Sequence, residues 1–455
     1  MRNPEAPHSL LKDEMTNVWA IAWPLILTNI LNVSVGLVDF KMVGILGVES
    51  IAAVGMSRQV IMFIMVLMIA ISGGSSVLVA HAYGANDPEL VSRVAARSAV
   101  YMLATALLIV APIGYFFSRP ILEMLGGSAL VVGLGDSYLK ILFTGSVFTM
   151  FNIGVSGILL GVGKTRVSLV MLLMVNVLNI GLNYVFIFGV GPIPAFGVAG
   201  AAIGTVAARG LGCIAGVWIL TTPRFPIHMR FKDGWHIDLG LIGRILYLGG
   251  PRSLQGIVRN FSRLMTIRII TLLPDATRSV SAYSVGMQVR MISSFIGLAF
   301  MSAAMARVGQ NLGAKDTDRA TKSGWIAAGF AAAIMSAFTV VFLAVPDLIM
   351  AFFTDDREVI SLGRTFFVII AVTEPIMAFA FALSGALRGG GDSLSPFLYG
   401  SISDLVVVIL VGYLLAVPAG MGFAGIATGI ALSALVRAFP ITLRYRRGKW
   451  KAAQF

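Results

Sequence analysis

Apolar runs long enough to cross a membrane follow one another along almost the whole 455-residue chain. A helix needs roughly 20 consecutive apolar residues to span a bilayer. Hydrophobic residues make up 57% of the chain and charged residues only 12%, whereas soluble globular domains carry about a quarter charged residues. The composition also excludes a disordered chain, which needs low hydrophobicity and high net charge. We therefore predict an all-α, polytopic membrane protein.

The apolar runs, separated by charged or Gly/Pro-rich breaks, predict twelve transmembrane helices. Several exceed the length that a straight crossing needs, so tilted or bent helices are expected. An even number of spans places both termini on the same side. The predicted spans are 16–43, 51–81, 92–118, 135–160, 167–190, 196–221, 241–272, 279–309, 321–350, 360–387, 394–416 and 421–443.

Lysine and arginine are unevenly distributed between the two sets of loops. One set, which includes both termini and the basic segment 222–240, holds most of them, whereas the opposite set is acidic around Asp355, Asp356 and Glu358. Cytoplasmic loops carry the excess of Lys and Arg, so we expect a cell-membrane protein with both termini in the cytoplasm. The net charge of +13 follows this topology and does not indicate a nucleic-acid partner.

The chain contains an internal repeat, because four pairs of motifs recur in order at nearly constant separation. We predict an N-terminal six-helix lobe over 1–221, a cytoplasmic linker over 222–240 and a C-terminal six-helix lobe over 241–455. Parallel repeats of this kind are a known plan of transporters whose substrate lies between the lobes. The pairs are Trp23-Pro24 with Gly250-Pro251, Gly84-Ala85-Asn86-Asp87 with Gly313-Ala314-Lys315-Asp316, Ser156-Gly157 with Ser384-Gly385, and Gly197, Gly200 and Gly204 with Gly422, Gly425 and Gly429.

Several of these motifs resemble those of the MATE (multidrug and toxic compound extrusion) transporters of the MOP flippase superfamily. The carriers of the resemblance are VDFKMVG at 38–44, GAND at 84–87, NIGLN at 179–183, GAAIGT at 200–205 and SGALRGGGDS at 384–393. The resemblance covers essentially the whole chain. It implies a V-shaped pair of six-helix bundles that exports compounds in exchange for protons or sodium ions.

Three acids fall clearly inside predicted spans: Asp39, Glu374 and Asp404. A charge at the bilayer centre costs at least about 2.5–3.5 kcal/mol, so such residues are functional candidates. We predict Asp39 as the coupling site, because a carboxylate in a low-dielectric cavity can alternate between its neutral and charged forms. The alternative is a constant ion pair with a neighbouring Arg or with Lys41, which is disfavoured because residues two apart point to different helix faces.

Asn179 and Asn183 share a helical face by their spacing, with Asn176 about one turn earlier and Thr205 in the next span. The resemblance implies that these four residues and Asp39 form a cation-coupling cluster. At the position of Asn183 the family often has Asp, so this chain offers one carboxylate in place of two. Sodium remains possible at Asp39, Asn179 and Asn183, but the lost negative charge favours protons. The alternative is that the amides only join helices.

The second lobe offers candidates for the substrate cavity. Glu374, which precedes Pro375, and Asp404, which aligns with Asn176, either form a second proton or cation site or neutralise arginines. Arg252, Arg259 and Arg263 share one helical face. If that face turns inward, the substrate carries a carboxylate, phosphate or sulfate, which guanidinium binds in a bidentate manner.

We therefore expect a secondary antiporter that exports small organic solutes or drugs in exchange for protons, by rocking of two lobes. The alternative is a flippase for a lipid-linked precursor or an exporter of anionic metabolites. The chain has no GxxxxGK[ST] motif for ATP hydrolysis, and we expect neither an enzyme nor a cofactor. Its single cysteine, Cys213, and its scattered histidines exclude a disulfide framework and a metal cluster. We expect a monomer embedded in the lipid bilayer.

Overall fold

The computed structural model describes residues 7–222, 229, 234 and 238–452, and these are almost entirely helical. In the described part, extended pairing is limited to an isolated bridge between Val190 and Ile193. The elements are α1 (Pro7–Gly44), α2 (Val48–Gly84), α3 (Pro88–Thr105), the π-helix η1 (Ala106–Val110), α4 (Ala111–Met124), α5 (Ala129–Thr144), α6 (Ser146–Gly161), α7 (Thr165–Phe188), α8 (Gly197–Thr221), α9 (Leu239–Ile270), α10 (Ala276–Gly313), α11 (Thr317–Ala344), α12 (Pro346–Ala351), α13 (Arg357–Ala371), α14 (Glu374–Gly389), α15 (Leu394–Ile402), the π-helix η3 (Ser403–Val411), α16 (Gly412–Ala416), α17 (Gly422–Arg446) and the 3₁₀-helix η4 (Lys449–Ala452).

The helices confirm the predicted fold class of an all-α membrane protein. Among the described residues, nine helical segments are long and apolar enough to cross a membrane, and two bent helix pairs bring the number to eleven. Helix α9 accounts for the remaining predicted span. It is 32 residues long, but its five arginines lower its hydropathy. The sequence prediction of twelve spans therefore agrees with the helices one by one.

Packing divides the chain into two compact units, and the divisions fall inside two helices. The C-unit consists of Met1–Ile26 with Pro251–Phe455, and the N-unit of Leu27–Gly250. Helices α1 and α9 therefore each begin in one unit and end in the other, and most of the predicted linker 222–240 lies outside the described residues. Both divisions lie beside a proline, Pro24 or Pro251. A proline inside a helix removes a backbone hydrogen bond and bends it, so its two halves can pack against different neighbours.

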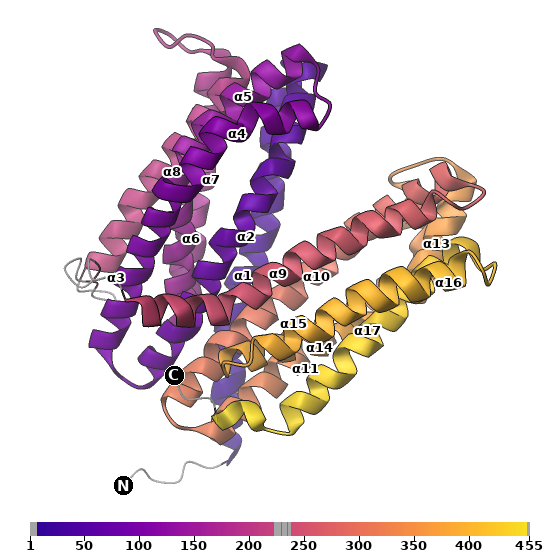
Figure 1. The fold of residues 1–455 in the computed structure, drawn as a ribbon. Coiled ribbons are helices and arrows are strands. Elements are labelled where there is room, and N and C mark those ends of the chain that lie inside the picture. Colours follow the sequence, from indigo (N-terminus) through magenta and orange to yellow (C-terminus); the bar gives the residue numbers. More distant parts are fainter. Residues whose placement is uncertain (1–6, 223–228, 230–233, 235–237, 453–455) are drawn as a thin grey trace. The chain divides into compact units, whose positions relative to one another are not determined.

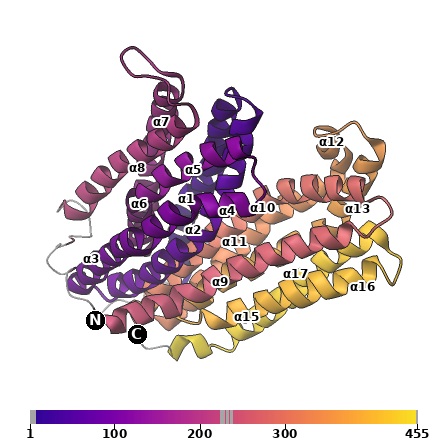
Figure 2. The ribbon, with the colours of Figure 1, turned by 45° about the horizontal axis from the view of Figure 1, so that its top comes forward.

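Within each unit the helices lie side by side as a bundle. In the C-unit, α14 packs against α10, α11 and α17, and in the N-unit α7 packs along α8 (Figure 1). The pairing of α16 with α17 is visible in both orientations (Figures 1 and 2). The first turns of α1 belong to the C-unit, where the ring of Trp19 lies 6.3 Å from that of Phe300 and 6.0 Å from that of Phe330.

The internal repeat is visible in the backbone geometry. Helices α5 and α6 meet at 52°, and α13 and α14 meet at 54° at the corresponding place in the second half. Asn86 and Lys315 are the described non-glycine residues with positive φ, at 53° and 61°. The acids that follow them, Asp87 and Asp316, cap α3 and α11 by accepting backbone N–H groups. The corresponding turns of the two halves therefore have the same backbone conformation and the same kind of helix cap.

Glycines let the first part of α9 approach α2 within the N-unit. A Cβ on Gly249 would overlap the carbonyl group of Ala70 and lie 2.9 Å from the backbone nitrogen of Gly74. Gly74 in turn faces the backbone of Ile245. Small residues at such contacts are how membrane helices approach closely.

We predict that Gly249→Ala destabilises the protein, because the added methyl group must push two backbones apart. Overpacking of this kind costs about 1–3 kcal/mol, so the midpoint of thermal unfolding in detergent should fall. The matched control is Gly243→Ala on the same helix, where an added Cβ meets nothing within 4 Å. An equal midpoint for the two variants would show that α9 and α2 are not held this closely.

Candidate cation-coupling site

Asp39 lies near the end of α1, in the part of that helix that belongs to the N-unit. Its side chain is half-buried, and its Oδ1 accepts a hydrogen bond of 2.9 Å from the side-chain amide of Asn183 on α7. Among the described residues it forms no ion pair, with Lys41 or with any arginine. The prediction that Lys41 would not pair with Asp39 therefore agrees with the geometry.

A chain of side-chain hydrogen bonds extends from Asp39 across α7 to α8. Asn179 donates to the Oδ1 of Asn183 at 3.3 Å and to the hydroxyl of Thr205 at 3.1 Å. Thr205 itself donates to the carbonyl oxygen of Ala201 at 2.8 Å. A Cβ on Gly204 would overlap the Oδ1 of Asn183, so glycine at this position lets α8 approach α7. Four of the five predicted residues are thus brought together.

Asn176 does not join this network. Its amide nitrogen is buried, and in the described part of the chain it has no hydrogen-bond partner. It lies on α7 one turn before Asn179, at the far end of the amide face from Asp39. The structure therefore places Asn176 beside the cluster rather than in it.

Three further side chains surround Asp39 that the sequence analysis did not select. Arg58 on α2 and Arg209 on α8 lie within electrostatic range of its carboxylate, and Tyr138 on α5 is also near it. Arg209 donates to the hydroxyl of Thr149 at 2.9 Å, and the guanidinium of Arg58 lies against Gly36, one turn before Asp39. A search for basic as well as acidic residues inside spans would have found both arginines.

The orientation of the amides limits what the cluster can bind. The Asn183 amide presents its NH₂ group, not its oxygen, to Asp39, and Asn179 presents its NH₂ group to Asn183 and Thr205. Sodium prefers oxygen ligands, so both amides would have to rotate before they could coordinate it. The arrangement as it stands stabilises a charged carboxylate by hydrogen bonding.

The acids of the C-unit are paired, in contrast to Asp39. Glu374 is fully buried. It accepts from Arg290 Nε at 2.8 Å and from the hydroxyl of Ser293. Asp404, at the start of η3, pairs with Arg437 at 2.5 Å. Of the two predicted roles for these acids, the contacts are those of arginine neutralisation.

The predicted arginine face of α9 forms no ion pair with these acids, although Asp404 lies within electrostatic range of Arg259. Arg252, Arg259 and Arg263 have no ion pair within the described residues. Two arginines that the sequence analysis did not weigh, Arg388 on α14 and Arg437 on α17, lie near Arg259. Arg388 belongs to the SGALRGGGDS motif at 384–393, but a sequence motif does not show whether a side chain is buried.

Comparison with known proteins assigns the chain to a family. Residues 24–185 and 251–414 match the family model MatE. The chain belongs to the MatE family. It is 26% identical over 444 residues to the "Uncharacterized transporter YisQ" of Bacillus subtilis, covering 96% of this chain and 95% of that protein. It is 27% identical over 458 residues to the "Multidrug resistance protein NorM" of Burkholderia vietnamiensis, covering 97% and 96%.

Solved structures of MatE transporters share the fold. One, described as the outward-facing conformation of a multidrug resistance MATE family transporter of the MOP superfamily, superposes with a TM-score of 0.87 at 20% identity and covers 100% of both chains. The match to the family model confirms the predicted family resemblance, and the superposition confirms the fold. MatE proteins are multi-pass membrane transporters that handle small organic substrates with ion coupling, and the chain is not an enzyme.

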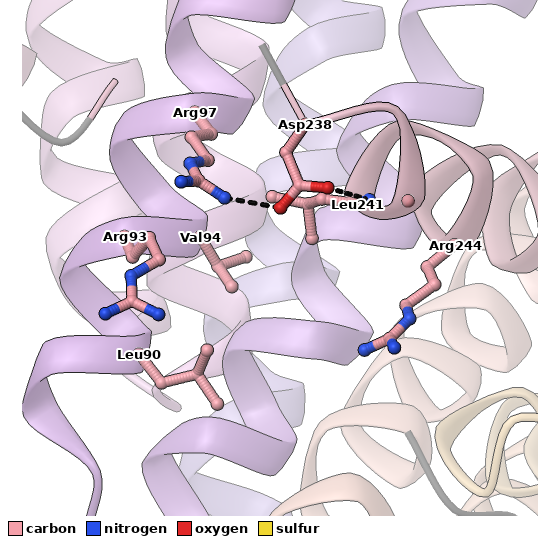
Figure 3. A pocket seen from close by; sticks show the side chains of 8 residues that line it. Leu90, Arg93, Val94, Arg97, Asp238, Leu241 and Arg244 are labelled. Carbon is pink, nitrogen blue, oxygen red and sulfur yellow. Dashed lines mark hydrogen bonds and ion pairs between the residues drawn. The ribbon is translucent and has the colours of Figure 1, made fainter. Parts of the chain in front are cut away.

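This MatE transporter also has a basic pocket in the N-unit, at the start of α9 (Figure 3). The cavity measures about 220 Å³, and Arg93 and Arg97 from α3 and Arg244 from α9 line it. Asp238 pairs with Arg97 at 2.5 Å and accepts the backbone N–H of Leu241 at 3.0 Å. Its carboxylate therefore caps α9 and ties the beginning of that helix to α3.

We predict that Asp238 stabilises this MatE transporter in a pH-dependent way. The Leu241 amide, followed by Arg97, holds the pKa of the Asp238 carboxyl below its ordinary value. A lowered folded-state pKa stabilises the fold above the unfolded value of about 3.9, and the effect is lost as the pH falls through the folded pKa. Asp238→Asn should thus lower the thermal midpoint at pH 7, by an amount that shrinks below about pH 4.

The reference for this experiment is Asp318→Asn, which removes an exposed acid from the first turn of α11. It corrects for the loss of one surface charge. A difference between wild type and Asp238→Asn that stays constant from neutral to acid pH would contradict a role for the charged carboxylate.

Proposed function

We propose that this MatE protein is an antiporter that exports small organic solutes in exchange for protons, with Asp39 as the coupling residue. The observation that carries the proposal is that Asp39 is a half-buried intramembrane acid held by an amide rather than by a cation. Glu374 is held in an ion pair with Arg290, whereas the carboxylate of Asp39 forms no ion pair among the described residues and is available for a proton. The name of the NorM relative supports organic solutes as cargo.

Protonation of Asp39 changes a contact between α1 and α7. The charged carboxylate accepts a hydrogen bond from Asn183, but a neutral carboxyl group is a weaker acceptor. Proton uptake therefore loosens the end of α1 from the bundle, and Pro24 lets that end move independently of the first turns. Proton release restores the bond. In this way the charge state of one residue biases the position of a helix that belongs to both units.

We favour protons over sodium for two reasons that come from the residues. Asn183 occupies a position where a second carboxylate would strengthen a sodium site, and the amides present NH₂ groups towards their neighbours.

We also infer that both termini are cytoplasmic and that the protein works as a monomer in the cell membrane. The excess of basic residues in the loops on the side of the termini supports this orientation.

We predict that Asp39→Asn folds and inserts but loses proton-driven export. Asparagine keeps the shape of the side chain, but it cannot bind and release a proton between pH 5 and 9. The measurement is export of a fluorescent organic solute from proteoliposomes under an imposed pH gradient. Glu123→Gln, which removes an exposed acid on α4, serves as the charge-matched control. Wild-type export by Asp39→Asn would rule out Asp39 as the coupling residue.

We further predict that a proton gradient drives export and a sodium gradient does not. Each gradient is imposed alone across the same proteoliposomes, at fixed pH for sodium and without sodium for protons. The expected result is solute export only in the proton arm. Export driven by inward sodium at fixed pH, with no response to the pH gradient, would reverse the assignment.

A second candidate, export of anionic metabolites, is favoured by one observation in the C-unit. Arg252 and Arg259 are not paired with any described acid, although they lie inside a helix of the membrane bundle. A protein that handled only organic cations would gain nothing from unpaired positive charge, which repels such cargo strongly in a low dielectric.

A further inference from the structure

The C-unit holds a cluster of guanidinium groups that is not balanced by acids. Arg388 is 3% exposed, and Arg252, Arg259 and Arg437 all lie within electrostatic range of it. One of these arginines, Arg437, forms an ion pair with an acid, Asp404. Arginine stays charged in proteins, and a buried unpaired charge is costly. Such an excess inside a membrane bundle indicates a site that receives negative charge.

Direct contacts join Gln255, Arg388, Arg437 and Asp404 of this cluster, partly through Gly400 on α15. Arg388 donates to the side-chain oxygen of Gln255 at 2.6 Å, and Gln255 packs against Gly400, where an added Cβ would overlap its amide. The carbonyl oxygen of Gly400 accepts from Arg437 at 3.3 Å. The backbone of Asp404 is fixed separately, because its carbonyl oxygen accepts from the hydroxyl of Ser262 at 2.7 Å.

Several polar atoms of this cluster are buried and have no partner in the described part of the chain. They are Arg388 Nε, Arg437 Nε and Asp404 Oδ2. The two nitrogens need an acceptor, whereas the carboxylate oxygen needs a donor. Buried polar groups are almost always satisfied, so the unused atoms define the chemistry of a missing partner: an anion that carries a hydrogen-bond donor beside its acidic group.

Part of the cluster lies at the surface of the C-unit. Arg252 is partly exposed and Arg259 is exposed. Together with Gln255 they occupy one face of α9, at spacings of three and four residues. The π-helix η3 begins beside Asp404, and π-helical segments are frequent at functional sites.

We propose that Arg252, Arg259, Arg388 and Arg437, with Gln255 and Asp404, form a binding site for the carboxylate or phosphate group of a transported solute. The arginines bind the anionic oxygens, and Asp404 Oδ2 accepts from a hydroxyl or ammonium group next to them. The proposal rests on the proposed export function for its physiological role, but the binding itself requires no gradient. It extends the predicted arginine face of α9 by two residues from other helices.

The test measures equilibrium binding to the purified full-length chain in phosphatidylcholine nanodiscs, by titration calorimetry. The probes are phenyllactate, phenylpropionate and phenethylammonium, which share a phenyl group and differ in charge and in one hydroxyl. We expect both carboxylates to bind, phenyllactate more tightly because its hydroxyl reaches Asp404, and the cation not to bind. Equal binding of the cation would overturn the proposal.

Arg259→Gln is the main variant, because its exposed side chain is replaced without disturbing the buried core. Loss of a charged hydrogen bond should weaken carboxylate binding by about tenfold or more. Arg388→Gln should act in the same direction where it folds. The matched control is Arg268→Gln, an exposed arginine further along α9. Unchanged binding in Arg259→Gln would show that these guanidinium groups are only structural, and would overturn the proposal.

Two further experiments complete the test. One identifies whether the bound anion is a lipid headgroup or a free solute, and the other distinguishes failure of this inference from failure of the proposed function. Phosphatidylglycerol in the nanodisc that displaces the carboxylates in wild type, but not in Arg259→Gln, would identify a lipid headgroup as the anion. Carboxylate binding that is indifferent to this lipid would identify a free solute.

Asp39→Asn should keep full binding while losing proton-driven export. Failure of binding with intact proton-driven export would overturn this inference and leave the proposed function standing.

Discussion

The cost of an ionised side chain in hydrocarbon governs the arrangement of the charged residues that are buried in the helix bundles. Glu14 shows how the cost is met. It is almost fully buried, and it accepts hydrogen bonds from Arg307, Arg319 and Ser323. Arg290 and Arg437 offset the charges of Glu374 and Asp404 in the same way. An intramembrane charge that is left without a counter-charge is therefore a candidate place for another species, a proton or a solute, to complete the site.

The same constraint explains why the two units differ although their backbones repeat. The turns, caps and bends recur at matching positions, since backbone geometry follows from glycines, prolines and capping acids that both halves contain. The charges do not recur. In the N-unit the carboxylate of Asp39 forms no ion pair and has Arg58 and Arg209 within electrostatic range. In the C-unit the intramembrane acids Glu374 and Asp404 are paired, and guanidinium groups such as that of Arg388 form no ion pair among the described residues. The sites proposed for the two units therefore differ in their central groups, a carboxylate in the N-unit and guanidinium groups in the C-unit.

Most of the fold was predictable from the sequence, and the reasons are physical. Hydrocarbon forces every backbone polar group into a helix, so the length of apolar runs gave the spans, and spacing on α7 gave the shared face of Asn179 and Asn183. Side-chain contacts between different helices were not predictable, because no local sequence pattern indicates that Arg437 pairs with Asp404 or that Arg388 donates to Gln255. The predicted lobe boundaries followed loops, whereas the compact units divide inside α1 and α9. Only packing against neighbours reveals such a division.

The combination of a protonatable aspartate with an anion site, as proposed, has an energetic consequence for the exchange. Export of a monocation for one proton moves no net charge, so the membrane potential adds nothing to it. Export of a monoanion for one proton moves two elementary charges in the favourable direction across a membrane that is negative inside. Each charge is worth about 2.3 kcal/mol per 100 mV, so this exchange gains roughly 4.6 kcal/mol per 100 mV. That is enough for more than a thousandfold further accumulation at about 1.4 kcal/mol per tenfold. An arginine-lined site in one unit and a protonatable aspartate in the other are thus energetically compatible, because the potential and the proton gradient act in the same direction.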